Sequence, residues 1–190
     1  MHYKKLVKRH KTQEKQKMEK KWWHHLTAYQ IYTRSFCDSN GDGIGDFQGI
    51  ISKLDYLQEL GIGAIWISPF NDSPNYDNGY DISDYYAILK DFGTMADLEE
   101  MIQECEKRDI IVMMDLVLNH CSHEHPWFLG ACKDRNGKYH DYYIWEEGTE
   151  DQPPEGSAAF FGGNVWEWVP QVKEYYLSLI HISEPTRHLR

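Results

Sequence analysis

Oxygen-bearing side chains alternate with glycines in one short stretch of the sequence, DSNGDGIGD, at residues 38–46. Glycines let a chain curl tightly, and carboxylate and carbonyl oxygens are the ligands of a hard cation. The stretch begins like an EF-hand loop, but Gly49 occupies the twelfth position, where that motif has a bidentate glutamate. We therefore expect a structural Ca²⁺ or Mg²⁺ site, with a solvated, turn-rich loop as the alternative. The expected ligands are Asp38, Asn40, Asp42, the backbone carbonyl of Ile44, and Asp46.

A second group of polar residues lies in DLVLNH, at the end of an apolar run. Strand alternation would place Asp115, Val117 and Asn119 on one face, with His120 in the loop beyond. A carboxylate and an imidazole at the open end of a strand could hold a polar substrate. A hydrogen-bonded core pair is the alternative.

A third group lies in YDNGYDISDYY, where Asp77 and Tyr80 combine a carboxylate with aromatic rings on a glycine-containing loop. Carbohydrate sites use this combination, because rings stack on the C–H faces of sugars while carboxylates accept their hydroxyls. A turn packed with aromatic residues is an equally good explanation. The aromatic clusters near Trp127, Tyr142, Trp145 and Trp166 leave the same two alternatives open, and packing is the expected role for most of them.

The elements that must position these groups alternate between strand and helix patterns. We expect strands over residues 28–32, 64–68 and 110–118, and the third is apolar enough to be buried on both faces of a parallel sheet. Three- and four-residue spacing predicts one helix over residues 47–60, ended by Gly61, and Thr94 with Asp97 predicts the cap of another. Polar residues beyond the strand ends favour an α/β barrel over a doubly wound sheet.

Composition narrows the class of protein further. A formal net charge of −10 argues against a general nucleic-acid binder, and no apolar run is long enough to span a membrane. Residues 1–21 form a basic extension without the apolar core of a signal peptide, and Met18 is an alternative start. The cysteines lack metal-binding spacing and are expected to be free thiols in a reducing cytoplasm: Cys37, Cys105, Cys121 and Cys132.

Read in order, the motifs resemble the N-terminal part of α-glucosidases of the oligo-1,6-glucosidase kind in the α-amylase superfamily. The stretches that carry the resemblance are AYQIYTRSFCDSNGDGIGDFQGI, GIGAIWISP, YDNGYDISDYYAILKDFGTMADLEE, VMMDLVLNHCSHEHPWF and DYYIWEEG. The resemblance implies an incomplete TIM (β/α)8 barrel, about its first three strands, over residues 22–120. The start of an inserted B domain would follow over residues 121–177, and residues 178–190 are expected to be a non-native tail.

The resemblance also implies an activity, the retaining hydrolysis of terminal α-1,6 or α-1,4 bonds in short gluco-oligosaccharides of the isomaltose type by a monomeric enzyme. It places the metal loop on the five residues named above, the glucose-binding pair on Asp77 and Tyr80, and a conserved motif on Asp115, Asn119 and His120. The nucleophile Asp, the acid Glu and a third Asp would lie beyond this chain. A trehalose-6-phosphate hydrolase, a sucrose isomerase and a non-catalytic sugar- or calcium-binding module remain alternatives.

Several positions depart from the family pattern. Thr33 stands where proline is common, and Cys121 and His123 stand where Thr or Ser and Asp are common. Glu155-Gly156 replaces a frequent Asn-Trp pair, which affects the expected shape of the B domain. None of these positions belongs to the expected glucose-contacting set.

The purified chain is therefore expected to lack glucosidase activity by itself, because its expected residues bind sugar but do not break the bond. The measurement is release of p-nitrophenol from p-nitrophenyl α-glucoside. Release above a no-protein blank would contradict the expectation.

Overall fold

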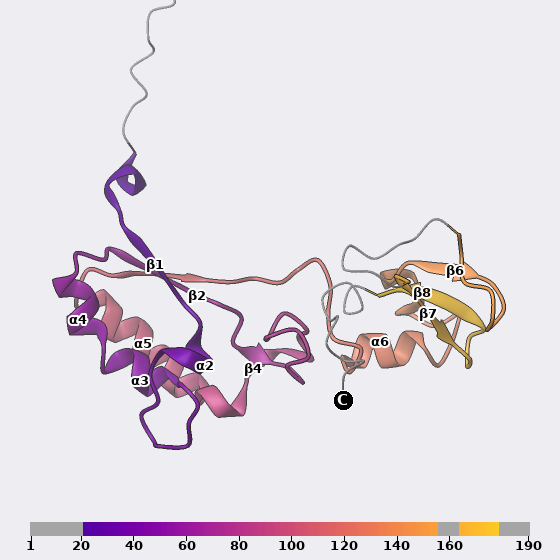
Figure 1. Cartoon of the computed structure of the whole chain (residues 1–190), viewed down its shortest axis with the longest axis horizontal. Coiled ribbons are helices and arrows are strands. Elements are labelled where there is room, and N and C mark those ends of the chain that lie inside the picture. The colour runs from indigo at the N-terminus through magenta and orange to yellow at the C-terminus, as the bar shows by residue number, and fades with distance from the viewer. Residues whose placement is uncertain (1–20, 156–163, 179–190) are drawn as a thin grey trace, which may run out of the picture.

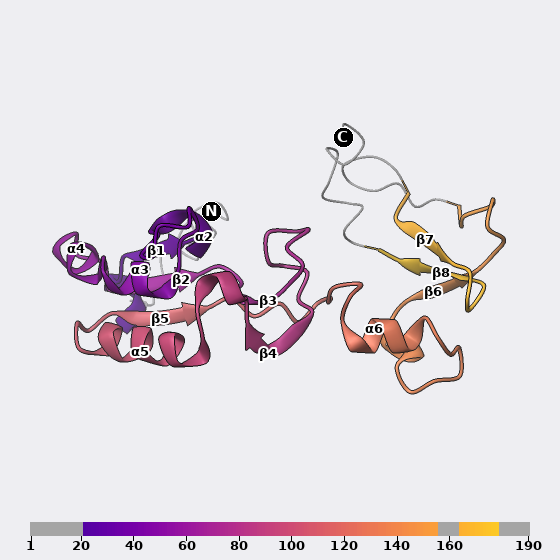
Figure 2. The same cartoon turned by 90° about the horizontal axis from the view of Figure 1, so that it is seen from below.

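The computed structural model describes residues 21–155 and 164–178 of the 190-residue chain. These residues form two bodies, and the segment that leaves strand β5 (Ile111–Met114) joins them (Figures 1 and 2). The basic residues 1–20, most of the expected tail (179–190) and Gly156 of the departing pair lie outside the described residues. Within the described part, no helix is long and apolar enough to cross a membrane.

The first body has the predicted β-α-β-α-β order. Strands β1 (Ala28–Ile31), β2 (Ala64–Ile67) and β5 pair in that order as a parallel sheet, with Ala28 opposite Ala64 and Ala64 opposite Ile111. Along the chain, a small antiparallel pair, β3 (Asn71–Asp72) and β4 (Asp84–Ile88), comes between β2 and the long helix of residues 95–106. The helices are η1 (Trp22–His25), α2 (Thr33–Phe36), α3 (Phe47–Ile51), α4 (Leu54–Glu59), η2 (Lys90–Phe92) and α5 (Met95–Glu106).

The single helix expected over residues 47–60 is in fact two helices, α3 and α4. An unbroken helix would bond the Lys53 N–H to the Gly49 carbonyl, but the Ser52 hydroxyl donates to that carbonyl at 2.7 Å. The Lys53 N–H bonds the Ile50 carbonyl instead, at 3.0 Å, and Lys53 leaves the helical region with φ −109° and ψ 1°. The predicted end at Gly61 is confirmed, with φ +77°.

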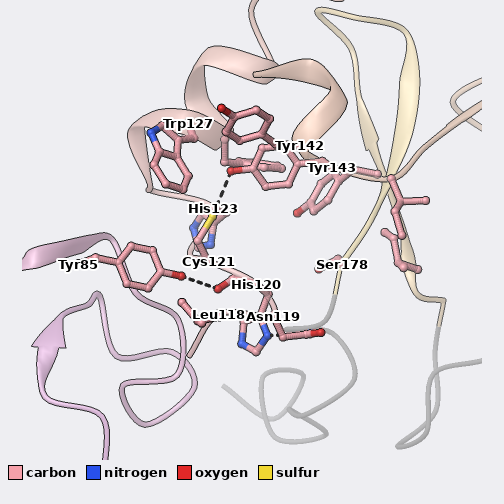
Figure 3. A pocket seen from close by; sticks show the side chains of 14 residues that line it. Tyr85, Leu118, Asn119, His120, Cys121, His123, Trp127, Tyr142, Tyr143 and Ser178 are labelled. Atoms are coloured by element: carbon pink, nitrogen blue, oxygen red, sulfur yellow. Dashed lines mark hydrogen bonds between the residues drawn. The ribbon is translucent and has the colours of Figure 1, made fainter. Parts of the chain in front are cut away.

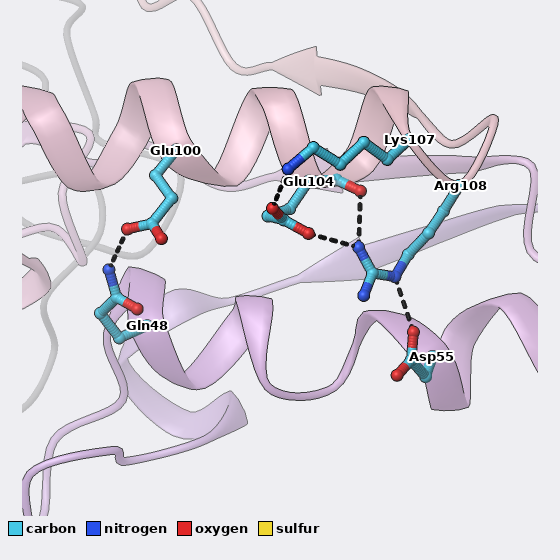
Figure 4. Close-up of polar contacts among 6 residues, drawn as sticks. All are labelled: Gln48, Asp55, Glu100, Glu104, Lys107 and Arg108. Atoms are coloured by element: carbon cyan, nitrogen blue, oxygen red, sulfur yellow. Dashed lines mark hydrogen bonds and ion pairs between the residues drawn. The ribbon is translucent and has the colours of Figure 1, made fainter.

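The helix start expected at Thr94 is also confirmed. The Thr94 hydroxyl accepts the Asp97 N–H at 3.3 Å, and the Asp97 carboxylate accepts the Thr94 N–H at 2.7 Å, which makes a capping box. Ion pairs then hold the far end of α5 against α4, because Arg108 donates both to Asp55 and to Glu104 at 2.7 Å (Figure 4). Arg108 thus links the end of α5 to α4.

The helices pack on one face of the parallel sheet. Ile65 and Ile67 of β2 are fully buried against them, and Val112 of β5 packs on the same core. The other core members come mainly from α3, α4 and α5, the strand ends and the β3–β4 pair: Ile31, Phe47, Ile50, Leu54, Leu57, Ile62, Phe70, Leu89, Phe92, Leu98, Met101, Cys105 and Ile110.

The expectation that the third strand is buried on both faces is wrong for the described residues. On the face away from the helices Ile111 is 39% exposed and Met113 is 41% exposed, and Trp66 of the neighbouring β2 is 39% exposed. The reason is that the helices of this body pack on the other face of the sheet, where the core that buries Ile65 and Ile67 lies.

The third strand is also shorter than residues 110–118, because its pairing with β2 stops at Asp115. The Asp115 N–H donates to the Ile67 carbonyl at 3.1 Å. The next bond along the ladder would need an N–H from Pro69, which proline lacks. Strand alternation therefore does not extend to Val117 and Asn119, and the prediction that they share a face with Asp115 is wrong: Val117 is buried and Asn119 is exposed.

The second body contains helix α6 (Pro126–Ala131), the turn η3 (His140–Tyr142) and an antiparallel sheet in the order β6-β8-β7 (Trp145–Glu147, Glu174–Leu177 and Trp166–Val169). This agrees with the expected loop-rich region of short strands. Glu174, only 3% exposed, anchors it by contacting His140 at 2.8 Å and Arg135 at 2.9 Å. These two contacts give the carboxylate hydrogen-bond partners in place of the water that it loses on burial.

One buried polar atom in the first body has no partner. Thr33 is 1% exposed, and its hydroxyl makes no hydrogen bond among the described residues. Because an unsatisfied buried hydroxyl is costly, Thr33→Val should raise the free energy of unfolding by about 1 kcal/mol. Urea denaturation would measure this. Thr33→Ser, which keeps the hydroxyl and loses the methyl group, is the control and should be less stable than the wild type; a Val variant less stable than the wild type would contradict the explanation.

Candidate functional site

The loops that follow β1, β2 and β5 leave the same edge of the sheet, because the three strands are parallel. In α/β barrels this carboxyl edge carries the functional residues. The loop after β1 holds the expected cation ligands, the loop after β2 holds Asp77 and Tyr80, and the segment after β5 holds Asp115, Asn119 and His120.

Two of the expected sugar-binding residues are in direct contact, although 35 positions separate them. The Tyr80 hydroxyl donates to the Asp115 carboxylate at 3.2 Å. Burial raises the pKa of Tyr80, and the negative charge of Asp115 raises it further, so the phenol remains a proton donor at neutral pH. Asp77 lies one turn away, since its carbonyl accepts the Tyr80 N–H at 3.0 Å. The structure therefore brings Asp77, Tyr80 and Asp115 together.

Asp81 shapes the loop that carries Asp77 and Tyr80. It is fully buried, and its carboxylate accepts the Tyr76 N–H at 2.9 Å, the Asp77 N–H at 3.0 Å and the Ser73 hydroxyl at 2.9 Å. These bonds replace the water that the charge loses on burial. The sequence reasoning missed Asp81. In the sequence Asp81 is one acidic residue among several in the same stretch, and nothing distinguishes it from the others.

The tip of the same loop requires glycine. Asn78 and Gly79 both have positive φ, 53° and 92°. A Cβ at Gly79 would lie 2.9 Å from the carbonyl oxygen of Pro69. The loop is thus folded tightly back onto the end of β2, which places Tyr80 next to Asp115.

Asn119 and His120 line a cavity of about 540 Å³ between the two bodies, and the other three residues are not among those that line it (Figure 3). The Asn119 Nδ2 and His120 Nδ1 atoms are 3.3 Å apart. The five expected residues thus form two sets, Asp77–Tyr80–Asp115 and Asn119–His120. Half of the other lining residues are Tyr, Trp or Phe, and the set comes from β4, the segment between β5 and α6, α6 itself, and the region from η3 to just past β8: Tyr85, Leu118, Cys121, His123, Trp127, Phe128, Tyr142, Tyr143, Ile144, Tyr176, Leu177 and Ser178.

The aromatic residues divide between packing and lining. Trp145 is a packing residue, because its ring stacks on His140 at 4.7 Å and its Nε1 donates to the His140 carbonyl at 2.8 Å. Trp127 and Tyr142 face the cavity, as Figure 3 shows. Tyr85, which sequence reasoning did not single out, donates to two backbone carbonyls of the segment that carries Asn119 and His120.

The unusual residues Cys121 and His123 also line this cavity. The Cys121 sulfur lies 3.1 Å from the Tyr143 hydroxyl, and burial raises the pKa of the thiol, so it stays protonated and is a poor nucleophile. The His123 ring packs on Tyr76 at 5.2 Å. His123 therefore packs the second body against the loop after β2, while Cys121 contacts Tyr143 within the second body.

The loop expected to bind a cation is ordered by its own side chains. Asp38 accepts the N–H groups of Gly41 at 2.7 Å and Gly43 at 2.8 Å, and these bonds lower its pKa. Asn40 and Asp42 each accept the N–H two residues further on, at 2.9 and 2.7 Å. The oxygen donor set suits Ca²⁺ or Mg²⁺. The described residues gather no group of three His, Cys, Asp or Glu side chains, so Asn40 and the Ile44 carbonyl would have to complete the shell.

Asp46 of this loop and Gly49, just beyond it in α3, have clear structural roles. Asp46 is 5% exposed and caps α3 by accepting the Gly49 N–H at 2.6 Å, while its other oxygen accepts the Ser39 hydroxyl at 2.8 Å. Gly49 replaces the glutamate of an EF-hand because α3 lies against the chain before the loop. A Cβ there would be 1.9 Å from the Cys37 carbonyl oxygen.

Comparison with known proteins shows the family. The model of the alpha amylase catalytic domain matches residues 30–187. An oligo-1,6-glucosidase from Bacillus cereus is 55% identical over 168 residues, which are 88% of this chain and 30% of that protein. The isomaltulose synthase of Klebsiella sp. LX3 has a TM-score of 0.81 at 51% identity, covering 84% of this chain and 29% of that one.

Another solved structure, the trehalose-6-phosphate hydrolase of Bacillus licheniformis, has a TM-score of 0.79 at 48% identity, and the match covers 84% of this chain and 29% of that one. The chain thus spans about 30% of the length of the relatives it matches. The parallel unit β1-β2-β5 is accordingly part of a TIM barrel, as the sequence predicted. With most of its residues inside the matched range, the chain belongs to the alpha-amylase catalytic-domain family.

Proposed function

We propose that this chain is the sugar-binding portion of a retaining α-glucosidase that acts on terminal α-1,6-linked glucose in short oligosaccharides. The observation that carries the proposal is the contact between Tyr80 and Asp115 at 3.2 Å, which unites the loops after β2 and β5 at the carboxyl edge. The proteins named oligo-1,6-glucosidase, at 55% and 53% identity, support the α-1,6 linkage. Action on α-1,4 bonds is the second possibility within the same mechanism.

The chemistry of the three gathered residues suits a glucose unit. The carboxylates of Asp77 and Asp115 can accept hydrogen bonds from sugar hydroxyls. The Tyr80 ring offers an apolar surface for C–H groups, and its hydroxyl fixes one oxygen of Asp115, leaving the other oxygen for the ligand. In this proposal Asp115 is a binding group.

Bond cleavage with retention needs two carboxylates about 5 Å apart, one as nucleophile and one as acid. We place both in the part of the relatives' length that this chain does not span.

The cysteines fit a reducing compartment such as the cytoplasm, since Cys37, Cys105, Cys121 and Cys132 are all free.

The sugar-binding role predicts that isomaltose binds to the wild-type chain and that Asp115→Asn weakens it roughly ten-fold. The reason is that the substitution replaces a charged acceptor, whose hydrogen bonds contribute about 1.5–3 kcal/mol, with a neutral one. Isothermal titration calorimetry with isomaltose measures this. Asp151→Asn, at an exposed site in the second body, is the matched control and should bind like the wild type. Equal affinity of the Asp115→Asn variant and the wild type would sink the proposed role of Asp115.

We also propose that the loop of residues 38–46 binds Ca²⁺, with Asp38, Asn40, Asp42, the Ile44 carbonyl and Asp46 as its ligands. An ion that binds only the folded loop stabilises the fold by mass action. Saturating Ca²⁺ should therefore raise the melting temperature above that in chelator, and Asp42→Asn should reduce the rise. Mg²⁺ in place of Ca²⁺ shows which ion the loop prefers. Identical melting curves with either ion and with chelator would rule out the metal site.

A further inference from the structure

Tyr85 connects β4, the segment after β5 and helix α6. Tyr85 lies on β4, and its hydroxyl is 2.9 Å from the Val117 carbonyl oxygen and 2.8 Å from the His120 carbonyl oxygen. Both oxygens can only accept, so the single phenolic proton is shared between them. The hydroxyl therefore closes the turn of residues 117–120 from the side, as Figure 3 shows for His120.

The segment that Tyr85 holds has little other support from regular structure. β5 ends at Met114, and the last bond to β2 is made by Asp115. Leu118 is 74% exposed, and Asn119 is exposed. The next backbone anchor is the Ser122 N–H, which donates to the Ile82 carbonyl at 2.8 Å. Between Asp115 and Ser122, the Tyr85 hydroxyl supplies the two hydrogen bonds that reach the turn from the β4 side.

Tyr85 is itself held firmly. Its carbonyl accepts the Asn71 side-chain amide at 2.9 Å, which fixes β4 against β3. Its ring packs against His125 at 5.7 Å and stacks on Trp127 at 6.4 Å. Burial raises its pKa, so the hydroxyl keeps its proton and remains a donor at neutral pH. A rigid donor that touches both bodies is suited to set the position of the turn between them.

We propose that Tyr85 is a positioning residue that holds the turn of residues 117–120, and with it the His120 imidazole, in the orientation required for sugar binding. The part of this inference that concerns sugar binding rests on the proposed function. The alternative is that Tyr85 only fills space between the loop after β2 and α6. In that case the ring would matter and the hydroxyl would not.

The decisive variant is Tyr85→Phe, which keeps the ring and its contacts and removes the hydroxyl. Tyr86→Phe is the matched control, because Tyr86 is the next residue on β4 and its side chain is 90% exposed. The first readout is the His120 ring signal in ¹H–¹⁵N NMR spectra across a pH titration, assigned with His120→Gln. A change in the His120 shifts or titration midpoint in Tyr85→Phe, and not in Tyr86→Phe, is expected. The same His120 titration in both variants would overturn the proposal.

The second readout is isomaltose affinity, expected to fall about five-fold in Tyr85→Phe and to stay unchanged in Tyr86→Phe. If the wild-type chain binds no isomaltose, the proposed function fails, while the His120 titration still decides the positioning role. If Tyr85→Phe does not fold, the hydroxyl is tested in the wild-type chain instead. Slow exchange of the Tyr85 hydroxyl proton with water, together with a nuclear Overhauser contact from that proton to residues 117–120, would then support the proposal, and fast exchange of that proton would overturn it.

Discussion

The position of the whole candidate site depends on where the β2–β5 ladder ends. Pro69 cannot donate the next hydrogen bond after Asp115 bonds to Ile67, so regular pairing stops at the carboxyl edge of the sheet. This single missing donor has two consequences. It fixes Asp115 at the end of the sheet, within reach of Tyr80. It also frees the following segment to leave the sheet and cross toward the second body.

Beyond that edge, side chains rather than strands and helices hold the backbone in place. Asp81 gathers the loop after β2 around a buried carboxylate, and Tyr85 closes the turn after β5. Loops held in this way can position binding residues, because the side chains that shape them have defined hydrogen-bond partners. The cation loop follows the same rule, with Asp38 accepting N–H groups from its own glycines.

The sequence predicted what periodicity and turn chemistry control, and it missed what single side-chain hydrogen bonds control. Strand order, the Thr94 cap and the end at Gly61 follow from periodicity and turn chemistry, and all are confirmed. The break between α3 and α4 depends on one Ser52 hydroxyl that competes for a helix carbonyl, which periodicity cannot register. Tyr85 was not predicted because its partners lie 32 and 35 positions away. Asp81 has partners four to eight positions away, and it was not predicted because nothing in the sequence distinguishes it from the acidic residues around it. The roles of the expected ligands in binding remain predictions.

The uncovered face of the sheet is a consequence of family membership. In a TIM barrel the helices cover the outside, and the opposite face of each strand points inward, where side chains of neighbouring strands fill the interior. Trp66, Ile111 and Met113 lie on that inward face, so their exposure marks the surface that further strands would bury. The site residues depend less on those strands, because the bonds that orient Asp115 and Tyr80 come from β2 and from their own loops. The rim of the barrel can therefore be specified locally while its interior needs the rest of the fold.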